Sequence, residues 1–440
     1  MIFTPLLALA AYASAAPAGT TISNSSIRST SVSSSITPSS TSSPDAALPS
    51  PTVAYASDDP NGSLLNQYQS GTPEPERGST GANILGPQNI PLERAKSYNT
   101  GAQILKHYDG GWARQQNDDA SEHDMPLATT MAGVNMRLDA GGIREMHWHL
   151  TAEWGYVMDG SCRVNAIDPQ GRNYLSDVYP GDLWYFPRGI PHSIQGLNDT
   201  AQGCEFLLVL DDGSFSEDST FLLTDWMAHV PKEVLAKNFR VNASAFDHIP
   251  DRQLWMLPSA VPTQNVDEAN PVSPAGIVPL PYTFAASKAS PTNTTGGTVK
   301  VIDSRTFNIS QTIAVAEVTV VPGGIRELHW HPTQPEWTFF LQGNARTTVF
   351  ASSANARTFD YQAGDIGYIP PTFGHYVENI GNTTLKYLEI FNSNIYEDIS
   401  LNQWLALTPP DMVKAHLQLS DETISQLQKV KPILVGPGEW

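Results

Sequence analysis

From about residue 130 onward the chain alternates short apolar runs with turns rich in glycine, proline and asparagine. Runs such as 183–186 and 206–210 are dense in aromatic and branched side chains, and turn residues separate them. This pattern predicts antiparallel β-strands. Helical periodicity occurs at only two places, 223–239 and 401–427. We therefore expect an all-β fold with two helical extensions.

The strand pattern belongs to an internal repeat. The stretch GGIREMHWH that begins at Gly141 recurs as GGIRELHWH at Gly323, and Gly-Asp at 181–182 recurs at 364–365. A repeat of this length indicates two tandem copies of one domain. A double-sheet jelly roll closes such a β-unit without long exposed edges, so it is the expected architecture of each copy.

The chain divides into five segments. Residues 1–16 hold an apolar run ending in small residues, which predicts a signal peptide. Residues 17–88 are rich in Ser, Thr and Pro and are expected to be disordered. The first domain is placed at 89–257, a proline-rich connection at 258–281, and the second domain with its C-terminal helices at 282–440.

The overall charge limits the partners. A formal net charge of −19 argues against nucleic-acid binding, because a polyanion would be repelled. No stretch after the leader is long and apolar enough to cross a membrane. A small-molecule substrate is therefore expected.

Export is indicated by the leader together with the glycosylation motifs. Asn-x-Ser/Thr sequons occur at Asn24, Asn61, Asn198, Asn242, Asn293, Asn308 and Asn382. We expect a secreted glycoprotein. The two cysteines, Cys162 and Cys204, fall in predicted strands of the first copy, where either one disulfide or two buried thiols would fit.

Each copy carries a candidate metal site. In a strand, His147 and His149 point to the same face because side chains alternate. Glu153 opens the next strand, and His192 comes from a later one. The second copy has the same set: His329, His331, Glu336 and His375.

Burying three imidazoles and a carboxylate in each copy without a cation would be costly. Three nitrogens and one oxygen with room for two more ligands favour an octahedral manganese or iron ion, one per copy. Structural zinc fits less well, because its sites are usually closed and contain thiolates.

The spacing in both copies resembles the first cupin motif, with glycine, His-x-His, glutamate and glycine at Gly141, His147, His149, Glu153 and Gly160, and at Gly323, His329, His331, Glu336 and Gly343. The second motif departs from the pattern, since Gly196 stands where asparagine is expected and Thr372 replaces a glycine. Neither departure removes a ligand.

Beyond this general signature, Arg-Glu-x-His-Trp-His in both copies and the segment 211–220 resemble the bicupin oxalate decarboxylases. The resemblance runs from about Gly110 to the C-terminus. It implies two tandem cupin barrels, two manganese ions per chain, dioxygen as redox cofactor, cleavage of oxalate to formate and carbon dioxide, and assembly into trimers or hexamers.

The resemblance also implies roles for four residues: Arg144, Arg326, Glu217 and Glu389. A guanidinium fork suits a carboxylate, but Arg144 precedes His147 by an odd offset, which in a regular strand places it on the opposite face. The alternative is that each arginine pairs with its neighbouring glutamate at the barrel rim. Glu217 would donate a proton from a lid over the first site.

Glu389 follows His375 by the same distance as Phe206 follows His192. It would be a proton donor or a partner of Arg326. We expect the chemistry at the first site, because only the first copy has the lid segment. The alternatives are an oxalate oxidase releasing hydrogen peroxide, which uses the same ligands, a flavonoid dioxygenase, which needs a roomy apolar pocket, and a non-enzymatic storage-type bicupin, which predicts eroded ligands.

Overall fold

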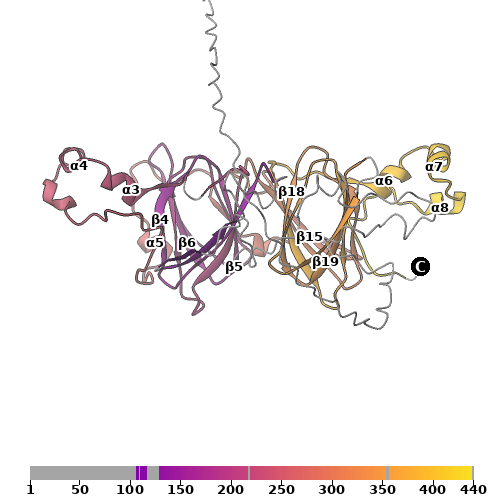
Figure 1. Cartoon of the computed structure of the whole chain (residues 1–440), viewed down its shortest axis with the longest axis horizontal. Helices are drawn as coiled ribbons and strands as arrows, with labels where there is room; N and C mark the ends of the chain where they lie inside the picture. Colours follow the sequence, from indigo (N-terminus) through magenta and orange to yellow (C-terminus); the bar gives the residue numbers. More distant parts are fainter. Residues whose placement is uncertain (1–105, 109, 116–127, 217–218, 353–355, 439–440) are drawn as a thin grey trace, which may run out of the picture. The chain divides into compact units, whose positions relative to one another are not determined.

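The computed structural model describes residues 106–108, 110–115, 128–216, 219–352 and 356–438 (Figure 1). The predicted signal peptide at 1–16, the predicted disordered segment at 17–88 and the candidate proton donor Glu217 lie outside the described residues.

The first barrel consists of two antiparallel sheets. Their strand orders are β1-β2-β3-β10-β5-β8-β13 and β11-β4-β9-β6-β7, and β12 also pairs with β4. The strands are β1 (Lys106–Tyr108), β2 (Gly111–Gln115), β3 (Ala132–Leu138), β4 (Ile143–Trp148), β5 (Glu153–Asp159), β6 (Cys162–Ile167), β7 (Asn173–Val178), β8 (Leu183–Phe186), β9 (His192–Gly196), β10 (Cys204–Leu210), β11 (Phe221–Leu222), β12 (Met256–Leu257) and β13 (Thr283–Phe284).

The second barrel repeats this plan with the orders β14-β15-β16-β23-β18-β21 and β20-β19-β22-β17-β24, and with β25 paired to β17. Its strands are β14 (Thr292–Thr294), β15 (Gly297–Ile302), β16 (Ala314–Val320), β17 (Ile325–Trp330), β18 (Glu336–Gln342), β19 (Asn344–Phe350), β20 (Ala356–Gln362), β21 (Ile366–Ile369), β22 (Gly374–Asn379), β23 (Leu385–Phe391), β24 (Ile399–Ser400) and β25 (Leu434–Val435). The predicted all-β fold of two double-sheet barrels is confirmed.

A helical arm follows each barrel (Figure 1). The first contains α3 (Leu223–Ala228), α4 (Lys232–Phe239) and the 3-10 turn η3 (Ala243–Phe246), and the second contains α6 (Leu401–Ala406), α7 (Pro410–Leu417) and α8 (Asp421–Gln426). The first division of each predicted helical range lies near a proline, Pro231 or Pro409, which starts a helix readily but cannot continue one. The division between α7 and α8 follows Gln418, which is in the left-handed conformation. Both arms leave from and return to the strand that carries His-x-His, through β11 and β12 or β24 and β25.

The outward-facing tryptophans of the His-x-His strands pack on these arms. The Trp148 ring lies 5.6 Å from Phe221 and 5.4 Å from Trp226, and Trp330 lies 5.6 Å from Trp404, between ring centroids. These tryptophans therefore make contacts within their own chain.

The connection between the barrels contains α5 (Val266–Ala269) and lies against the first barrel. Arg163 donates to the carbonyl of Gln264 at 3.0 Å, and Asn173 donates to the side chain of Asn270 at 2.8 Å. Strand β13, which the sequence placed in the second domain, pairs with β8 of the first barrel. The short turn η4 (Ala286–Lys288) follows it.

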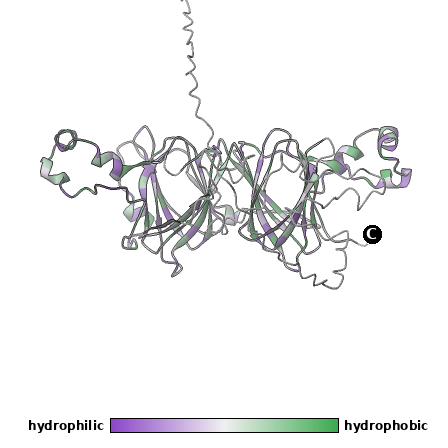
Figure 2. Ribbon diagram, viewed as in Figure 1, coloured by the Kyte–Doolittle hydropathy of each residue, from purple (hydrophilic) through white to green (hydrophobic). Residues whose placement is uncertain are grey.

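Hydrophobic residues line the strands of both barrels (Figure 2). Each barrel encloses its own cluster, with Phe186 and Phe206 in the first and Phe340 and Tyr387 in the second. A third cluster contains residues of both barrels, among them Trp154, Tyr156, Trp337, Phe339 and Leu388.

Cys162 and Cys204 form a disulfide that joins β6 of one sheet to β10 of the other. The alternative of two free thiols is thereby excluded. The equivalent positions of the second barrel hold Ala345 and Leu385, both fully buried in its core. Among the described residues, no helix has the length and hydrophobicity needed to cross a membrane.

Candidate metal centres

In the first barrel, His147, His149, Glu153 and His192 converge inside the barrel, and their ligand atoms all lie within 4.8 Å of one another. Glu153 Oε2 is 3.3 Å from the Nε2 atoms of both His149 and His192. All four side chains are buried. The structure thus brings together the complete set that the sequence proposed.

The protonation of these imidazoles suits metal binding. Each ring places Nδ1 against a backbone carbonyl, at 2.6 Å from Glu145 O for His147 and 2.8 Å from Ile190 O for His192. Because a carbonyl only accepts, Nδ1 carries a proton, and Nε2 is the atom that each ring presents to a cation, giving up any proton it holds when the cation binds. Burial, followed by the charges of His192 and Arg144, lowers the pKa of His147 well below its usual value, so this ring is neutral.

Glu153 is held in its ionised form. Burial would raise its pKa, but His192 and His149 hold it well below the usual range. Its second oxygen, Oε1, accepts a hydrogen bond from the indole of Trp184 at 2.9 Å. A charged carboxylate with one oxygen fixed and the other facing two imidazoles is a preformed ligand.

The second barrel forms the same arrangement from His329, His331, Glu336 and His375. Glu336 Oε2 lies 3.0 Å from His331 Nε2 and 3.1 Å from His375 Nε2. The Nε2 atom of His329 is buried and has no hydrogen bond among the described residues. Buried nitrogens of this kind need a partner, and a divalent cation bound by three imidazoles and one carboxylate fits both sites.

Arg144 reaches the first site because its strand is irregular. Arg144 is opposite Ile194 and His147 is opposite His192, so three steps along β4 match two along β9. This β-bulge inserts one residue and reverses the alternation, and β17 has the same irregularity between Arg326 and His329. The odd offset is thereby resolved, and both arginines face the barrel interior.

The neighbouring glutamates do not pair with these arginines. Glu145 is buried and accepts from the backbone N–H groups of Thr224, Leu254 and Trp255. The alternative in which each arginine pairs with its neighbouring glutamate at the rim is therefore wrong for the first barrel.

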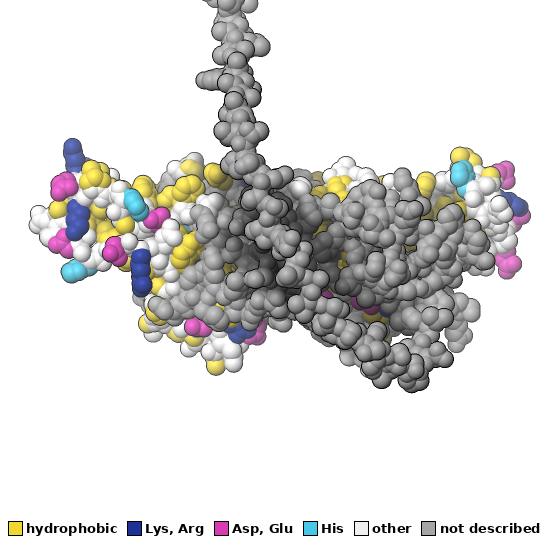
Figure 3. Space-filling view, in the orientation of Figure 1, with side chains coloured by type: hydrophobic (Ala, Val, Ile, Leu, Met, Phe, Trp, Pro, Cys, Tyr) yellow, Lys and Arg dark blue, Asp and Glu magenta, His cyan; other side chains and the backbone are white. Residues whose placement is uncertain are grey.

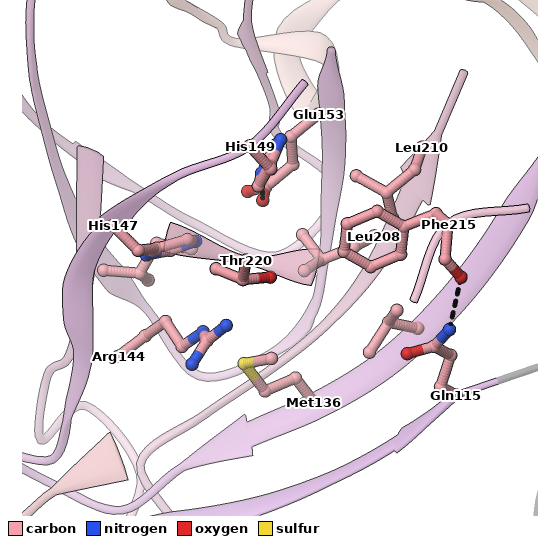
Figure 4. A pocket seen from close by; sticks show the side chains of 12 residues that line it. Gln115, Met136, Arg144, His147, His149, Glu153, Leu208, Leu210, Phe215 and Thr220 are labelled. Carbon is pink, nitrogen blue, oxygen red and sulfur yellow. Dashed lines mark hydrogen bonds and ion pairs between the residues drawn. The ribbon is translucent and has the colours of Figure 1, made fainter. Parts of the chain in front are cut away.

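A small pocket opens beside the first set of ligands (Figure 4). Arg144 and Thr220 lie near His147 in this view, and the opposite wall is apolar. The apolar lining residues are Val134, Met136, Ile194, Leu208, Leu210 and Phe215. The Thr220 hydroxyl is buried and has no hydrogen bond among the described residues. A small anion placed here would meet a guanidinium and a hydroxyl next to the ligands.

Arg326, the counterpart of Arg144, is bonded to side chains of its own barrel. Its Nη2 lies 2.7 Å from both Tyr396 Oη and Asp398 Oδ2, and its Nε lies 3.2 Å from Glu389 Oε1. The guanidinium is fully buried. Two acidic side chains of its own barrel therefore lie beside its charge; Asp398 is held ionised, whereas burial raises the pKa of Glu389.

The counterpart of Glu389 is Leu208, because Glu389 pairs with Ala316 and Thr338 as Leu208 pairs with Val134 and Gly155. The match with Phe206 was wrong, since the loop before β10 is two residues longer than the loop before β23. Asp398 precedes β24 as Thr220 precedes β11. The first site therefore has Leu208 and Thr220 where the second has carboxylates.

Two residues that position the metal ligands were not singled out from the sequence. Trp184 donates to Glu153 and lies across Gly155, where a Cβ would meet its ring at 2.0 Å. In the second barrel Thr338, the counterpart of Gly155, donates to Glu336 at 2.7 Å, and Gly367 replaces the tryptophan. Both exchanges, Gly155 for Thr338 and Trp184 for Gly367, are visible when the sequences of the two copies are aligned.

Two double-sheet barrels, each with a buried set of three histidines and one glutamate, define a metal-binding protein of the cupin class. The chain matches the cupin family over residues 110–246 and 284–425.

Oxalate decarboxylase OxdC of Bacillus subtilis is 46% identical over 380 residues, covering 82% of this chain and 97% of that protein. A probable oxalate decarboxylase of Arthroderma benhamiae is 44% identical over 331 residues, covering 74% of this chain and 80% of the relative. The solved structure of the Bacillus subtilis enzyme at pH 4.6 aligns with a TM-score of 0.74 and 46% identity, covering 80% of this chain and 88% of that one. The chain belongs to the oxalate decarboxylases of the cupin family.

Proposed function

We propose that the chain cleaves oxalate to formate and carbon dioxide in the first barrel, with manganese at both sites and dioxygen as redox cofactor. The observation that carries this proposal is the position of Arg144, which lines one small pocket together with His147, His149 and Glu153. Similarity to decarboxylases that act on oxalate supports the substrate, and a solved structure that concerns the Mn(II) centres of the Bacillus subtilis enzyme supports the metal.

Manganese, when bound, supplies a positive charge for oxalate oxygens and a redox couple with dioxygen. Arg144 binds the other carboxylate of the substrate through its planar N–H fork. The Thr220 hydroxyl donates a further hydrogen bond, and the apolar wall around Leu208 excludes water. The carbon–carbon bond breaks, carbon dioxide leaves, and the remaining carbon takes a proton to become formate.

That proton needs an acid, and Glu217 is the proposed donor. Its neighbours Ser216 and Ser219 are joined, because Ser219 donates from its backbone N–H and its hydroxyl to Ser216 O at 3.0 and 2.6 Å. Gln115 fixes the start of this segment by donating to Phe215 O at 2.8 Å (Figure 4). The second site, whose arginine is matched by carboxylates, is proposed to be chiefly structural, with Glu389 as a partner of Arg326.

The decisive experiment measures formate and hydrogen peroxide per oxalate consumed by manganese-loaded protein under air. We expect one formate per oxalate, at a rate that rises as pH falls from neutral toward about 4–5, because the reaction consumes a proton. Peroxide without formate would identify an oxalate oxidase instead. No consumption of oxalate by the fully metallated protein would favour the storage-type alternative.

We further propose a secreted, glycosylated homo-oligomer, either a trimer or a hexamer. The disulfide suits an oxidising compartment. The sequon residues Asn198, Asn242, Asn293, Asn308 and Asn382 are all exposed. Hydrophobic side chains, including Trp226, Phe239 and Trp404, are also exposed on the helical arms. Figure 3 shows hydrophobic side chains among charged groups on both arms.

A further inference from the structure

The Glu145 side chain, next to Arg144 on β4, binds backbone N–H groups at both ends of the first helical arm. This carboxylate is 3% exposed and accepts from Thr224 N at 2.8 Å, Leu254 N at 3.0 Å and Trp255 N at 2.9 Å. Three N–H donors satisfy a buried carboxylate. Because Thr224 begins the helical arm and Trp255 ends it, one side chain fixes both ends of the arm to β4.

Trp255 adopts a left-handed backbone conformation with φ of +58°. This conformation is rare for a residue with a large side chain and persists only where its surroundings enforce it. It directs the Trp255 carbonyl to β4, where it accepts from Glu145 N at 2.9 Å and from Arg144 Nη1 at 3.2 Å. The indole ring also lies against the guanidinium, with Arg144 Cζ 5.2 Å from its centroid. One residue therefore contacts Arg144 through both its backbone and its side chain.

The second barrel keeps the backbone part of this arrangement and loses the ring. Ile433, with φ of +64°, donates to Glu327 Oε1 at 3.0 Å and accepts from Arg326 Nη1 at 3.4 Å. Arg326 takes its remaining contacts from Glu389, Tyr396 and Asp398. An aromatic face orients a guanidinium without cancelling its charge, whereas a carboxylate cancels it.

We propose that Glu145 and Trp255 are positioning residues for substrate binding, which hold the Arg144 guanidinium in the first pocket with its charge directed at a carboxylate of the substrate. The proposal rests on the function proposed above. The two barrels differ at this position, because an indole stands beside Arg144 where the second barrel has Ile433 beside Arg326.

The test is Trp255→Ile, which introduces the residue that already occupies this backbone conformation in the second barrel. A contact of this type is worth about 0.5–2 kcal/mol, which corresponds to roughly a 2- to 30-fold rise in KM for oxalate. We expect kcat within about twofold of wild type and an unchanged manganese content. Trp255→Phe, which keeps a ring, should remain near wild type. Ile433→Leu is the matched control and should leave KM unchanged.

A binding measurement separates this inference from the proposed reaction. The affinity of the manganese-loaded protein for malonate, a small dicarboxylate, is measured by calorimetry for wild type and the same variants. Weaker malonate binding by Trp255→Ile, restored in Trp255→Phe, supports the positioning role even if wild type makes no formate.

Glu145→Gln provides the second arm, because an amide cannot accept from all three N–H groups. It should raise KM and weaken malonate binding in addition to lowering Tm. A folded, fully metallated Trp255→Ile protein with unchanged KM and malonate affinity would overturn the proposal. If Trp255→Ile does not fold, the Glu145→Gln protein decides. A Glu145→Gln protein with a lower Tm but unchanged KM and malonate affinity would overturn the proposal, since Glu145 would then contribute to stability only.

Discussion

Arg326 and Asp398 form a buried ion pair, with Nη2 and Oδ2 2.7 Å apart and both side chains at most 3% exposed. Burial would raise the pKa of Asp398, but Arg326 and Lys431 hold it well below its usual range. The second site therefore has a fixed carboxylate beside its arginine at every pH at which the enzyme is expected to work.

This pair predicts a specific pH dependence of stability. Because the pKa of Asp398 is lower in the folded state than its unfolded value of about 3.9, its contribution is complete above that value and disappears as pH falls toward the folded pKa. Asp398→Asn should lower the free energy of unfolding by about 3 kcal/mol at pH 7 and at pH 5, and by less at pH 2–3. Denaturant titrations of both proteins check this, and a difference that stays constant down to pH 2 would contradict it.

Asp360→Asn is the control for that prediction. Asp360 pairs with Arg346 but is 40% exposed, so its removal should cost less than about 1 kcal/mol at any pH.

The two histidine sites should differ when each loses a ligand. His147→Ala should abolish formate production and halve the manganese content, because it removes a ligand from the site whose pocket contains Arg144. His329→Ala should mainly reduce Tm or assembly. Activity per bound manganese, measured for both variants, checks the assignment. Equal values would remove the basis for placing the chemistry in the first barrel.

The proton donor is tested by Glu217→Gln, which keeps the size of the side chain and removes the acid. Formate production should fall by about 10²–10⁴, the usual contribution of a positioned acid. Oxalate should still bind, and peroxide with two carbon dioxide molecules per oxalate should appear in place of formate. Manganese content is measured alongside. A fully metallated variant that makes formate at nearly the wild-type rate would redirect the search to Glu389.

Thr372 predicts a stabilising substitution. Its φ is +71°, and that of its counterpart Gly189 is +72°. The backbone N–H of Thr372 donates to His331 O at 2.8 Å, and that of Gly189 donates to His149 O at 3.0 Å. A branched residue is strained in this conformation, so Thr372→Gly should raise the free energy of unfolding by about 1 kcal/mol. Gly189→Ala, whose Cβ would meet no atom within 4 Å, should lower it by a similar amount. A Thr372→Gly protein with a lower Tm would contradict this account of the strain.

The sequence predicted the parts of the site that depend on strand alternation and on the repeat. His147 and His149 share a face because one residue separates them, and the matched histidines of the second copy confirmed the register. The position of Arg144 did not follow from the same rule, because a β-bulge inserts one residue between it and His147. A bulge depends on the partner strand and leaves no pattern in the strand that contains it.

Contacts between a side chain and backbone groups far away in the chain could not be predicted from the sequence either. Glu145 looked like the rim partner of Arg144, but it binds N–H groups at 224, 254 and 255, which the folding of the arm brings together. The match of Glu389 with Phe206 failed because counting from His375 ignored a loop whose length differs between the copies. The counterpart of Glu389 is Leu208, which is identified by its pairing partners across the sheet and not by distance along the chain.

One hydrophobic cluster contains Trp154 and Tyr156 of the first barrel together with Trp337 and Phe339 of the second, so the two barrels pack against each other through buried side chains. Tyr156 also donates to Glu317 of the second barrel at 2.9 Å. Heat should therefore melt both barrels in a single endotherm, and a cation bound in either one should raise the melting temperature of the whole chain. A second barrel that turned over no substrate would still affect the first, because loss of its cation would lower the melting temperature of both.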